Sequence, residues 1–257
     1  MGRQFSDTLL AAYLCELDQA GKSLATISLV VTAVKWYLKA TKQEFSFDLT
    51  NLKLKAIHRD STASGRGQVD GLTWPEVERI CTLAEADRTV AGLRDSALIR
   101  LMSDCLLRIS EVVAINVEDV DSVLYIRQSK TDQEREGSTL YVGPSTREAI
   151  NRYCIEGSIV KGALFRRVRY QRHVCPGRLS VDGVRGAIKR RAEEAGIEGF
   201  ISGHSLRVGS AISLAQAGAS VVEMQVAGRW KSPQMPAHYA RAELADRGAI
   251  ARFKYRK

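Results

Sequence analysis

A short run of small and polar residues, Ser61 to Gly67 (STASGRG), divides this 257-residue chain into two unequal parts. Periodic apolar residues, which are typical of helices that pack on a core, occur on both sides of the run but not within it. A domain boundary is therefore expected here. We expect residues 63–69 to be a linker between a first domain at residues 1–62 and a second at residues 70–257.

The first domain has the pattern of a small helical unit. Ser23 can cap a helix whose apolar residues recur at the i, i+3, i+4 and i+7 spacing, namely Ile27, Val30, Val31, Val34 and Leu38. Lysines lie on the other faces of this amphipathic helix. Further helices are expected around Leu9 to Leu17 and around Leu52 to His58.

The second domain is predicted to be mainly helical with a little sheet. Thr73 and Glu76 form a capping box, and the apolar stripe from Ala97 to Leu106 predicts a core helix that leads to Arg108. Val123 to Gln128 and Ser138 to Val142 read as two short strands of one hairpin. The expected fold class is mainly α with a small antiparallel β-sheet.

The chain carries a formal charge of +9, and residues 185–257 hold thirteen basic side chains against six acidic ones. This excess favours a polyanion as partner, although charge alone fits a solvated basic face equally well. The candidate DNA-binding residues lie on the helix after Ser23, in the arginine-rich stretch FRRVRYQR and on a predicted helix after Ser180. They are Lys35, Lys39, Lys42, Arg166, Arg167, Arg169, Arg185, Lys189 and Arg190.

Several classes of protein are not favoured by this sequence. Its five cysteines are scattered without a C-x-x-C pair, which argues against a disulfide framework or structural zinc and fits a reducing cytoplasm. We find no apolar run that approaches the roughly 18 residues of a membrane span. Phosphate-binding loops, H-E-x-x-H motifs and tight carboxylate clusters are also missing from the sequence, so no metal or cofactor is expected.

The residues that could carry chemistry are a set of cations and one phenol. They are Arg108 with Glu111, Lys130, His204 with Arg207, Trp230 and Tyr239. Arginine's planar fork suits the oxygens of a phosphate, and a tyrosine nucleophile needs nearby cations and a separate acid for the leaving oxygen. Taken singly, each motif is also typical of a surface pair, a solvated lysine or a packing aromatic residue.

In their order along the chain, three segments resemble the tyrosine recombinases, or phage-type integrases. The segments are LMSDCLLRISEVVAINVEDV, YIRQSKTD and SGHSLRVGSAISLAQAGASVVEMQVAGRWKSPQMPAHYAR. The sequence resembles the Cre-like subgroup at two positions. It has Val208 at the end of the segment HSLRV, and it has Trp230 where a histidine is commoner in the family. Ala227, Gly228 and Arg229 stand where the family usually has L-G-H, and the N-terminal unit is short for the family.

The resemblance implies a core-binding (SAM-like) DNA-binding domain at residues 1–62 and a catalytic domain at 70–257 with a C-terminal protomer-docking helix. Tyr239 would attack the scissile phosphate to form a 3′-phosphotyrosyl link. Arg108 and Arg207 would bind the non-bridging oxygens, with His204 and Trp230 as further donors. Lys130 would be the general acid, and Glu111 would orient its neighbours.

The implied reaction is site-specific strand exchange between double-stranded DNA sites, without metal or ATP. The implied assembly is a homotetramer on two DNA sites that forms from monomers, in the cytoplasm with the nucleoid. A type IB topoisomerase-like enzyme would share this chemistry, and a relative that has lost catalysis would keep only DNA binding. An adduct that survives denaturation separates the inactive relative from the two enzymes, and a requirement for paired sites separates the recombinase from the topoisomerase.

Overall fold

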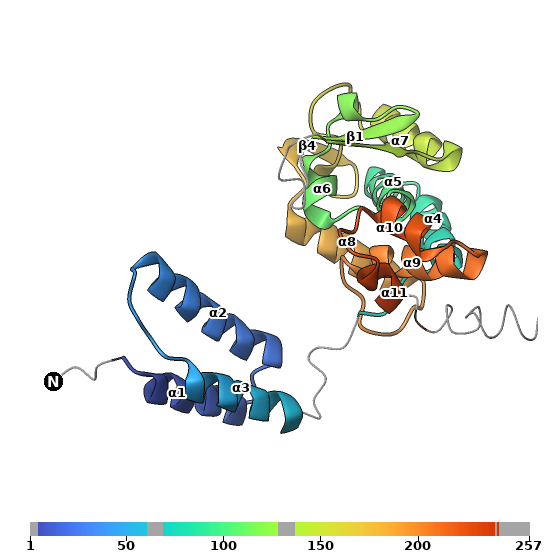
Figure 1. Ribbon diagram of the computed structural model, residues 1–257. Helices are drawn as coiled ribbons and strands as arrows, with labels where there is room; N and C mark the ends of the chain where they lie inside the picture. Colours follow the sequence, from blue (N-terminus) through green and yellow to red (C-terminus); the bar gives the residue numbers. More distant parts are fainter. Residues whose placement is uncertain (1–4, 61–68, 128–136, 240, 242–257) are drawn as a thin grey trace, which may run out of the picture. The chain divides into compact units, whose positions relative to one another are not determined.

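The computed structural model describes residues 5–60, 69–127, 137–239 and 241. The chain separates into two compact units, residues 1–68 and residues 69–257, and each is described by itself (Figure 1). Both units consist mainly of helices, and the second also contains two small antiparallel sheets. No helix among the described residues has the length and apolar character needed to cross a membrane.

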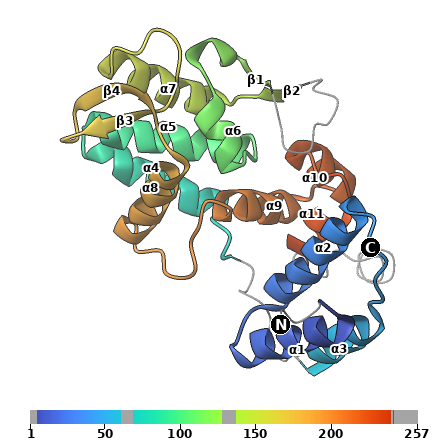
Figure 2. The same cartoon turned by 90° about the vertical axis from the view of Figure 1, so that its left-hand side faces the viewer.

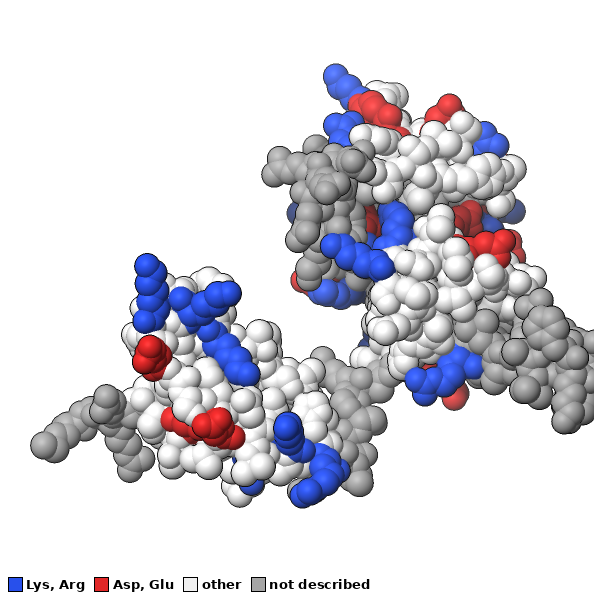
Figure 3. All heavy atoms as spheres, viewed as in Figure 1, with Lys and Arg blue, Asp and Glu red and all other residues white. Residues whose placement is uncertain are grey.

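The first unit consists of α1 (Asp7–Gln19), α2 (Leu24–Ala40) and α3 (Asp48–Asp60). Ser23 caps α2 by accepting a hydrogen bond from the Thr26 backbone N–H, as its position in the sequence predicts. Helices α1 and α3 lie side by side (Figures 1 and 2), and the Asp7 carboxylate joins them by accepting hydrogen bonds from the backbone N–H groups of Leu49 and Thr50. Exposed lysine side chains, among them Lys35 and Lys39, gather over α2 (Figure 3).

The second unit begins with α4 (Trp74–Ala86) and α5 (Val90–Asp104). The remaining elements are α6 (Ile109–Ala114), a short 3₁₀ helix η1 (Val117–Asp119), β1 (Val123–Ile126), β2 (Ser138–Tyr141), α7 (Pro144–Glu156), β3 (Arg166–Arg169), β4 (His173–Arg178), α8 (Val181–Glu194), α9 (Ser205–Ala217), α10 (Val221–Gly228) and α11 (Gln234–Tyr239). Helices α9, α10 and α11 pack together (Figures 1 and 2).

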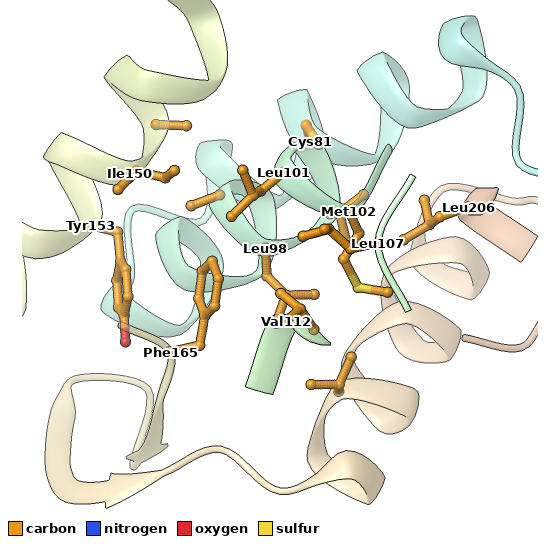
Figure 4. Packing of buried hydrophobic residues seen from close by; sticks show 14 of the residues in the cluster. Cys81, Leu98, Leu101, Met102, Leu107, Val112, Ile150, Tyr153, Phe165 and Leu206 are labelled. Carbon is orange, nitrogen blue, oxygen red and sulfur yellow. The ribbon is translucent and has the colours of Figure 1, made fainter. Parts of the chain in front are cut away.

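Helix α5 forms the centre of the second unit and is buried along nearly its whole length. Leu98, Leu101 and Met102 extend from it into a core that also receives residues of α4, α6, α7, α8 and α9 (Figure 4). The rings of Tyr153 and Phe165 stack at one side of this core, with their centroids 6.1 Å apart. The burial explains why the predicted stripe from Ala97 to Leu106 is so apolar.

The two sheets are both antiparallel hairpins. Strands β1 and β2 pair with each other, as the sequence predicts, and the structure sets Leu124 opposite Leu140. The second hairpin, β3 with β4, was not predicted, because its charged residues and its Pro-Gly pair obscure the alternation of a strand. Val168 nevertheless packs against the core, while its neighbours Arg167 and Arg169 are exposed.

Close contacts between α5 and α9 place the ends of these helices beside each other. The Ser210 hydroxyl donates to the Ser103 carbonyl oxygen at 2.9 Å. Gly209 brings α9 against the backbone of Leu72, where an added Cβ would overlap the Leu72 carbonyl group. These contacts hold α9 against α5 and against the segment before α4.

Candidate active site

Three stretches of the second unit meet around one point: the turn after α5, the start of α9, and the segment from the end of α10 into α11. Leu106 takes a positive φ of 46°, so the chain turns sharply and the next side chain, Leu107, enters the core. Of the seven predicted catalytic residues, the stretches bring together Arg108, Glu111, His204, Arg207, Trp230 and Tyr239. The seventh, Lys130, lies outside the described residues.

Arg207 is the most enclosed cation of the cluster, with 1% of its surface exposed. Its two terminal nitrogens donate to the carbonyl oxygens of Leu106 and Gly228, which fixes the plane of the guanidinium. Burial, and then the charges of Arg108 and Arg229, lower the pKa of Arg207 to about 10. Among the described residues, positive charge is therefore concentrated around Arg207.

Trp230 covers Arg207 from one side. The Arg207 guanidinium carbon lies 4.4 Å from the centroid of the Trp230 ring, a cation–π contact that supports the guanidinium without consuming a donor. Gly228 is required in this arrangement, because an added Cβ would overlap the Trp230 ring. Trp230 is 9% exposed and contributes to a small apolar cluster around Met224, so it also has a packing role.

Glu111 is the buried carboxylate of the site. Its side chain is 2% exposed, and its Oε1 lies 2.8 Å from Nη1 of Arg108. The Arg108 backbone N–H donates to the other oxygen, Oε2, at 3.0 Å, so Glu111 holds both the backbone and the side chain of Arg108. Burial raises the pKa of Glu111, but Arg229 and then Arg108 outweigh it, and the net pKa lies below its ordinary value.

His204 and Tyr239 face each other across the site. Nε2 of His204 lies 3.0 Å from the Tyr239 hydroxyl oxygen, and the tautomer of the ring decides which group donates. Burial lowers the pKa of His204, as do Arg207 and Arg108. Burial raises the pKa of Tyr239, while the same two arginines act in the opposite direction. These shifts favour a neutral His204 beside a protonated Tyr239, in which the Tyr239 hydroxyl donates the hydrogen bond to Nε2.

Arg229 is a member of the cluster that the sequence did not single out as functional. Its Nη2 lies 2.8 Å from Oε2 of Glu111, and its side chain is 12% exposed. In the sequence it is a departure from the usual L-G-H segment, and a basic residue beside the predicted Trp230 was the available signal. The contact with Glu111 joins residues 118 positions apart, which no local pattern reveals.

The candidate DNA-binding residues differ in what they contact. Arg167 and Arg169 of β3, and Lys39 and Lys42 of the first unit, are exposed. Lys35 donates to the Asn51 side chain, and Arg185 and Lys189 form exposed ion pairs within α8. Arg166 and Arg190 instead bind their own unit, Arg166 through carbonyl oxygens of the preceding turn and Arg190 through Asp95.

Among the described residues, no group of three or more His, Cys, Asp or Glu side chains could hold a metal ion. The five cysteines are unpaired. Besides the Glu111 carboxylate, the described part of the site holds arginines, His204, Trp230 and the Tyr239 phenol, and these groups suit an anion with several oxygens such as a phosphate.

The sequence of this chain is similar to sequences of known recombinases. The chain is 24% identical to the recombinase Cre of Escherichia phage P1 over 224 residues, which is 79% of this chain and 65% of that protein. The chain thus spans slightly under two thirds of Cre. It is 27% identical to the tyrosine recombinase XerD of Oceanobacillus iheyensis over 255 residues, 95% of this chain and 81% of XerD.

Solved structures share the fold at low sequence identity. The XerH site-specific recombinase bound to palindromic difH substrate matches with a TM-score of 0.71 and 16% identity, over 98% of this chain and 74% of that chain. A lambda integrase dimer bound to a COC' core site matches with a TM-score of 0.64 and 18% identity, over 92% and 80% of the two chains. The model of the phage integrase family matches residues 71–245, more than half of the sequence and all of the described cluster. The chain therefore belongs to the phage integrase family, the tyrosine recombinases that its motifs resemble.

Proposed function

We propose that this chain is a site-specific tyrosine recombinase that cleaves and rejoins duplex DNA through a 3′-phosphotyrosyl intermediate. The observation that carries the proposal is the position of Tyr239, whose hydroxyl lies 3.0 Å from His204 and under the charge of Arg207 and Arg108. A phenol placed between a base and two arginines is equipped to attack a phosphodiester. The family match and the relatives named as recombinases support the same reaction.

In the proposed reaction, the Tyr239 oxygen attacks the scissile phosphorus, and the bond to the 5′-oxygen of the next nucleotide breaks. The phenol proton passes to Nε2 of His204, and Lys130 gives a proton to the leaving 5′-oxygen. A 5′-hydroxyl of the partner strand then attacks the phosphotyrosine and gives its proton to Lys130, and the released Tyr239 oxygen takes its proton back from His204. One phosphodiester is lost and one is formed, so the reaction needs no external energy source.

Arg108 and Arg207 are the proposed ligands of the non-bridging oxygens, whose negative charge grows in the transition state. Their geometry is fixed before DNA binds, because Arg207 is held by two carbonyl oxygens and Arg108 by Glu111. Preorganised donors of this kind stabilise a transition state without a cost of reorganisation. Trp230 supports Arg207, and its indole N–H is the proposed additional donor.

The proposed partner is a pair of double-stranded DNA sites, on which four copies of the chain assemble. The first unit would bind DNA through the basic side chains over α2, and the second through exposed arginines such as Arg167 and Arg169. The segment after Tyr239 that would dock into a neighbouring copy lies outside the described residues. The reaction would take place in the cytoplasm, with the nucleoid.

The test of the proposal is a covalent adduct. Duplexes selected from a random pool by the protein are made with a nick next to the scissile phosphate, so that the released strand is lost and the adduct accumulates. We expect wild type to give an adduct that survives denaturation, and Tyr239→Phe to give none while it binds the same DNA. Tyr170→Phe, which alters a tyrosine that is 93% exposed, is the matched control.

Three outcomes would overturn parts of the proposal. No adduct from wild type on any selected site would leave DNA binding without catalysis. An undiminished adduct from Tyr239→Phe would identify another nucleophile. Relaxation of supercoiled plasmids that lack a selected site would identify a topoisomerase-like enzyme, because strand exchange requires paired sites.

A further inference from the structure

Arg229 ends helix α10 in a backbone conformation that favours glycine. Its φ is 53°, in the left-handed region, where a side chain with a Cβ is disfavoured. Glycine is the usual residue at such a helix end. The conformation alone therefore does not explain an arginine here, and the explanation has to come from the side chain.

The Arg229 side chain is directed into the cluster rather than toward solvent. Nη2 lies 2.8 Å from Oε2 of Glu111, and 3.5 Å from the Leu106 carbonyl oxygen. Nε and Nη1 are buried and have no hydrogen-bond partner among the described residues. Burial without partners is costly for a cation, so Arg229 is not placed to stabilise the fold by hydrogen bonding of its whole guanidinium.

The contact with Glu111 changes the charge of the site. Glu111 also holds Arg108, and its carboxylate, with Oε1 2.8 Å from Nη1 of Arg108, would offset the positive charge that Arg108 presents to a phosphate. Arg229 adds a compensating positive charge on the other carboxylate oxygen. It is the largest of the influences that lower the pKa of Glu111 against the effect of burial, and it also lowers the pKa of Arg207.

We propose that Arg229 is a positioning residue that neutralises Glu111, so that Glu111 can hold Arg108 in place without reducing the positive potential that Arg108 and Arg207 present to the scissile phosphate. Direct contact with DNA is not part of this role, because Nε and Nη1 of Arg229 are buried. The proposal rests on the proposed strand-cleavage function, and it concerns how that site keeps its charge.

The proposal is tested by substituting Arg229 in two backgrounds, one with the Glu111 carboxylate and one in which Glu111→Gln removes its charge. Glycine suits the left-handed backbone at this position, so we expect Arg229→Gly to keep the fold. We expect it to slow adduct formation on the nicked duplex about tenfold or more at saturating protein. In the Glu111→Gln background, where no carboxylate needs neutralising, the same change is expected to slow the reaction less than threefold.

A structural role for Arg229 predicts a different result. If Arg229 only packs the end of α10, its removal costs the same factor in both backgrounds. A cost in the Glu111→Gln background that is not at least threefold smaller than in wild type therefore overturns the proposal. Arg88→Gly is the matched control, because Arg88 also has a left-handed φ, of 50°, but is exposed at the end of α4; we expect it to leave the rate unchanged.

Two further measurements keep the outcomes distinct. Arg229→Lys retains the charge, and we expect it to react faster than Arg229→Gly. If Arg229→Lys reacts no faster than Arg229→Gly, the proposal is overturned. The same comparison applies if Arg229→Gly does not fold. Wild type is assayed in the same experiment. An absent wild-type adduct contradicts the proposed function, whereas a normal wild-type adduct with an unaffected Arg229→Gly contradicts only the role of Arg229.

Discussion

Asp95 and Glu111 are both buried carboxylates surrounded by arginines, but the arginines around them are balanced in different ways. Asp95 is fully buried and accepts hydrogen bonds or ion pairs from Arg94, Arg190 and Arg191. Arg191 also pairs with Asp87 and Glu194. This cluster joins α5 to α8 and to the loop before α5, with three arginines set against three carboxylates.

The cluster around Glu111 has a different balance. Arg108 and Arg229 share Glu111, and Arg207 donates to the neutral carbonyl oxygens of Leu106 and Gly228. The pKa values reflect this difference. Burial lowers the pKa of Arg191, but its carboxylate partners outweigh burial and raise it, whereas burial and neighbouring cations lower the pKa of Arg207 to about 10.

The comparison separates two uses of buried arginine. Arginines matched by carboxylates connect secondary-structure elements, and little of their charge is available to a ligand. Arginines held by carbonyl oxygens keep their charge in a low-dielectric setting, where a phosphate can use it. The first arrangement should be important for stability and the second for catalysis, and variants of the two clusters can test that division.

The largest expected effect is that of Arg207→Ala. Removing a preorganised donor from the transition state should slow adduct formation about 10²- to 10³-fold, or about 3 to 4 kcal/mol. Arg94→Ala removes an arginine from the Asp95 cluster and is the matched control; among the molecules that remain folded, it should react within a few-fold of wild type. Thermal unfolding of both variants checks that each protein is folded. If Arg207→Ala cleaves at nearly the wild-type rate, Arg207 does not take part in catalysis.

Asp95→Asn should lower the stability of the fold and leave the rate of adduct formation nearly unchanged. Three arginines lose their shared charge partner, so we expect the second unit to be destabilised by about 3 kcal/mol, with a melting temperature about 8 °C lower. Below that temperature, adduct formation should stay within a few-fold of wild type. Asp182→Asn, which removes an exposed partner of Arg185, should leave the melting temperature nearly unchanged. A catalytic defect as large as that of Arg207→Ala would show that the two clusters are not separate in function.

The two clusters also show what the sequence can and cannot predict. Apolar periodicity predicted helices such as the one after Ser23 and the buried α5, because that signal is local. The order of several short motifs led to Arg108, His204, Arg207 and Tyr239 as one set, and the structure brings these residues together.

Contacts between distant residues carry no such signal. Arg190 and Lys189 are neighbours in one basic run, and the sequence placed both among the candidate DNA-binding residues. Only the fold brings Asp95 within 2.7 Å of Arg190. The contact of Arg229 with Glu111 was missed for the same reason, since it depends on how α6 and α10 meet.

The pH dependence of cleavage tests the proposed role of His204 within the Glu111 cluster. Burial, Arg207 and Arg108 lower its pKa below the ordinary value of 6.5, so the folded protein resists protonation of His204. The neutral form that accepts the Tyr239 proton should therefore persist below pH 6.5, and the rate should fall about tenfold per pH unit only beneath the lowered pKa. The stability of the fold should decline earlier, as the pH falls from 6.5 to the lowered pKa, because in that interval the unfolded chain binds the proton and the folded chain does not.

The rate of wild type and of His204→Gln is measured from pH 8 to pH 5 on the nicked duplex. His204→Gln should be slower at neutral pH and should lose the decline at low pH. A wild-type rate that begins to fall above pH 6.5 would contradict the lowered pKa. A decline that persists unchanged in His204→Gln would assign the titration to another group.

The smallest expected effect distinguishes Lys189 from Arg190 on α8. Lys189 has only an exposed ion pair with Glu193 at 3.8 Å, which costs little to break, whereas Nη2 of Arg190 lies 2.7 Å from the fully buried Asp95. If both side chains face DNA, Lys189→Ala should lower the slope of log affinity against log salt by about one, because one phosphate contact is lost. Arg190→Ala should change that slope less, since its charge is already engaged by Asp95. Equal changes would mean that Arg190 leaves Asp95 when DNA binds, and the Asp95 cluster would then contribute to DNA binding as well as to stability.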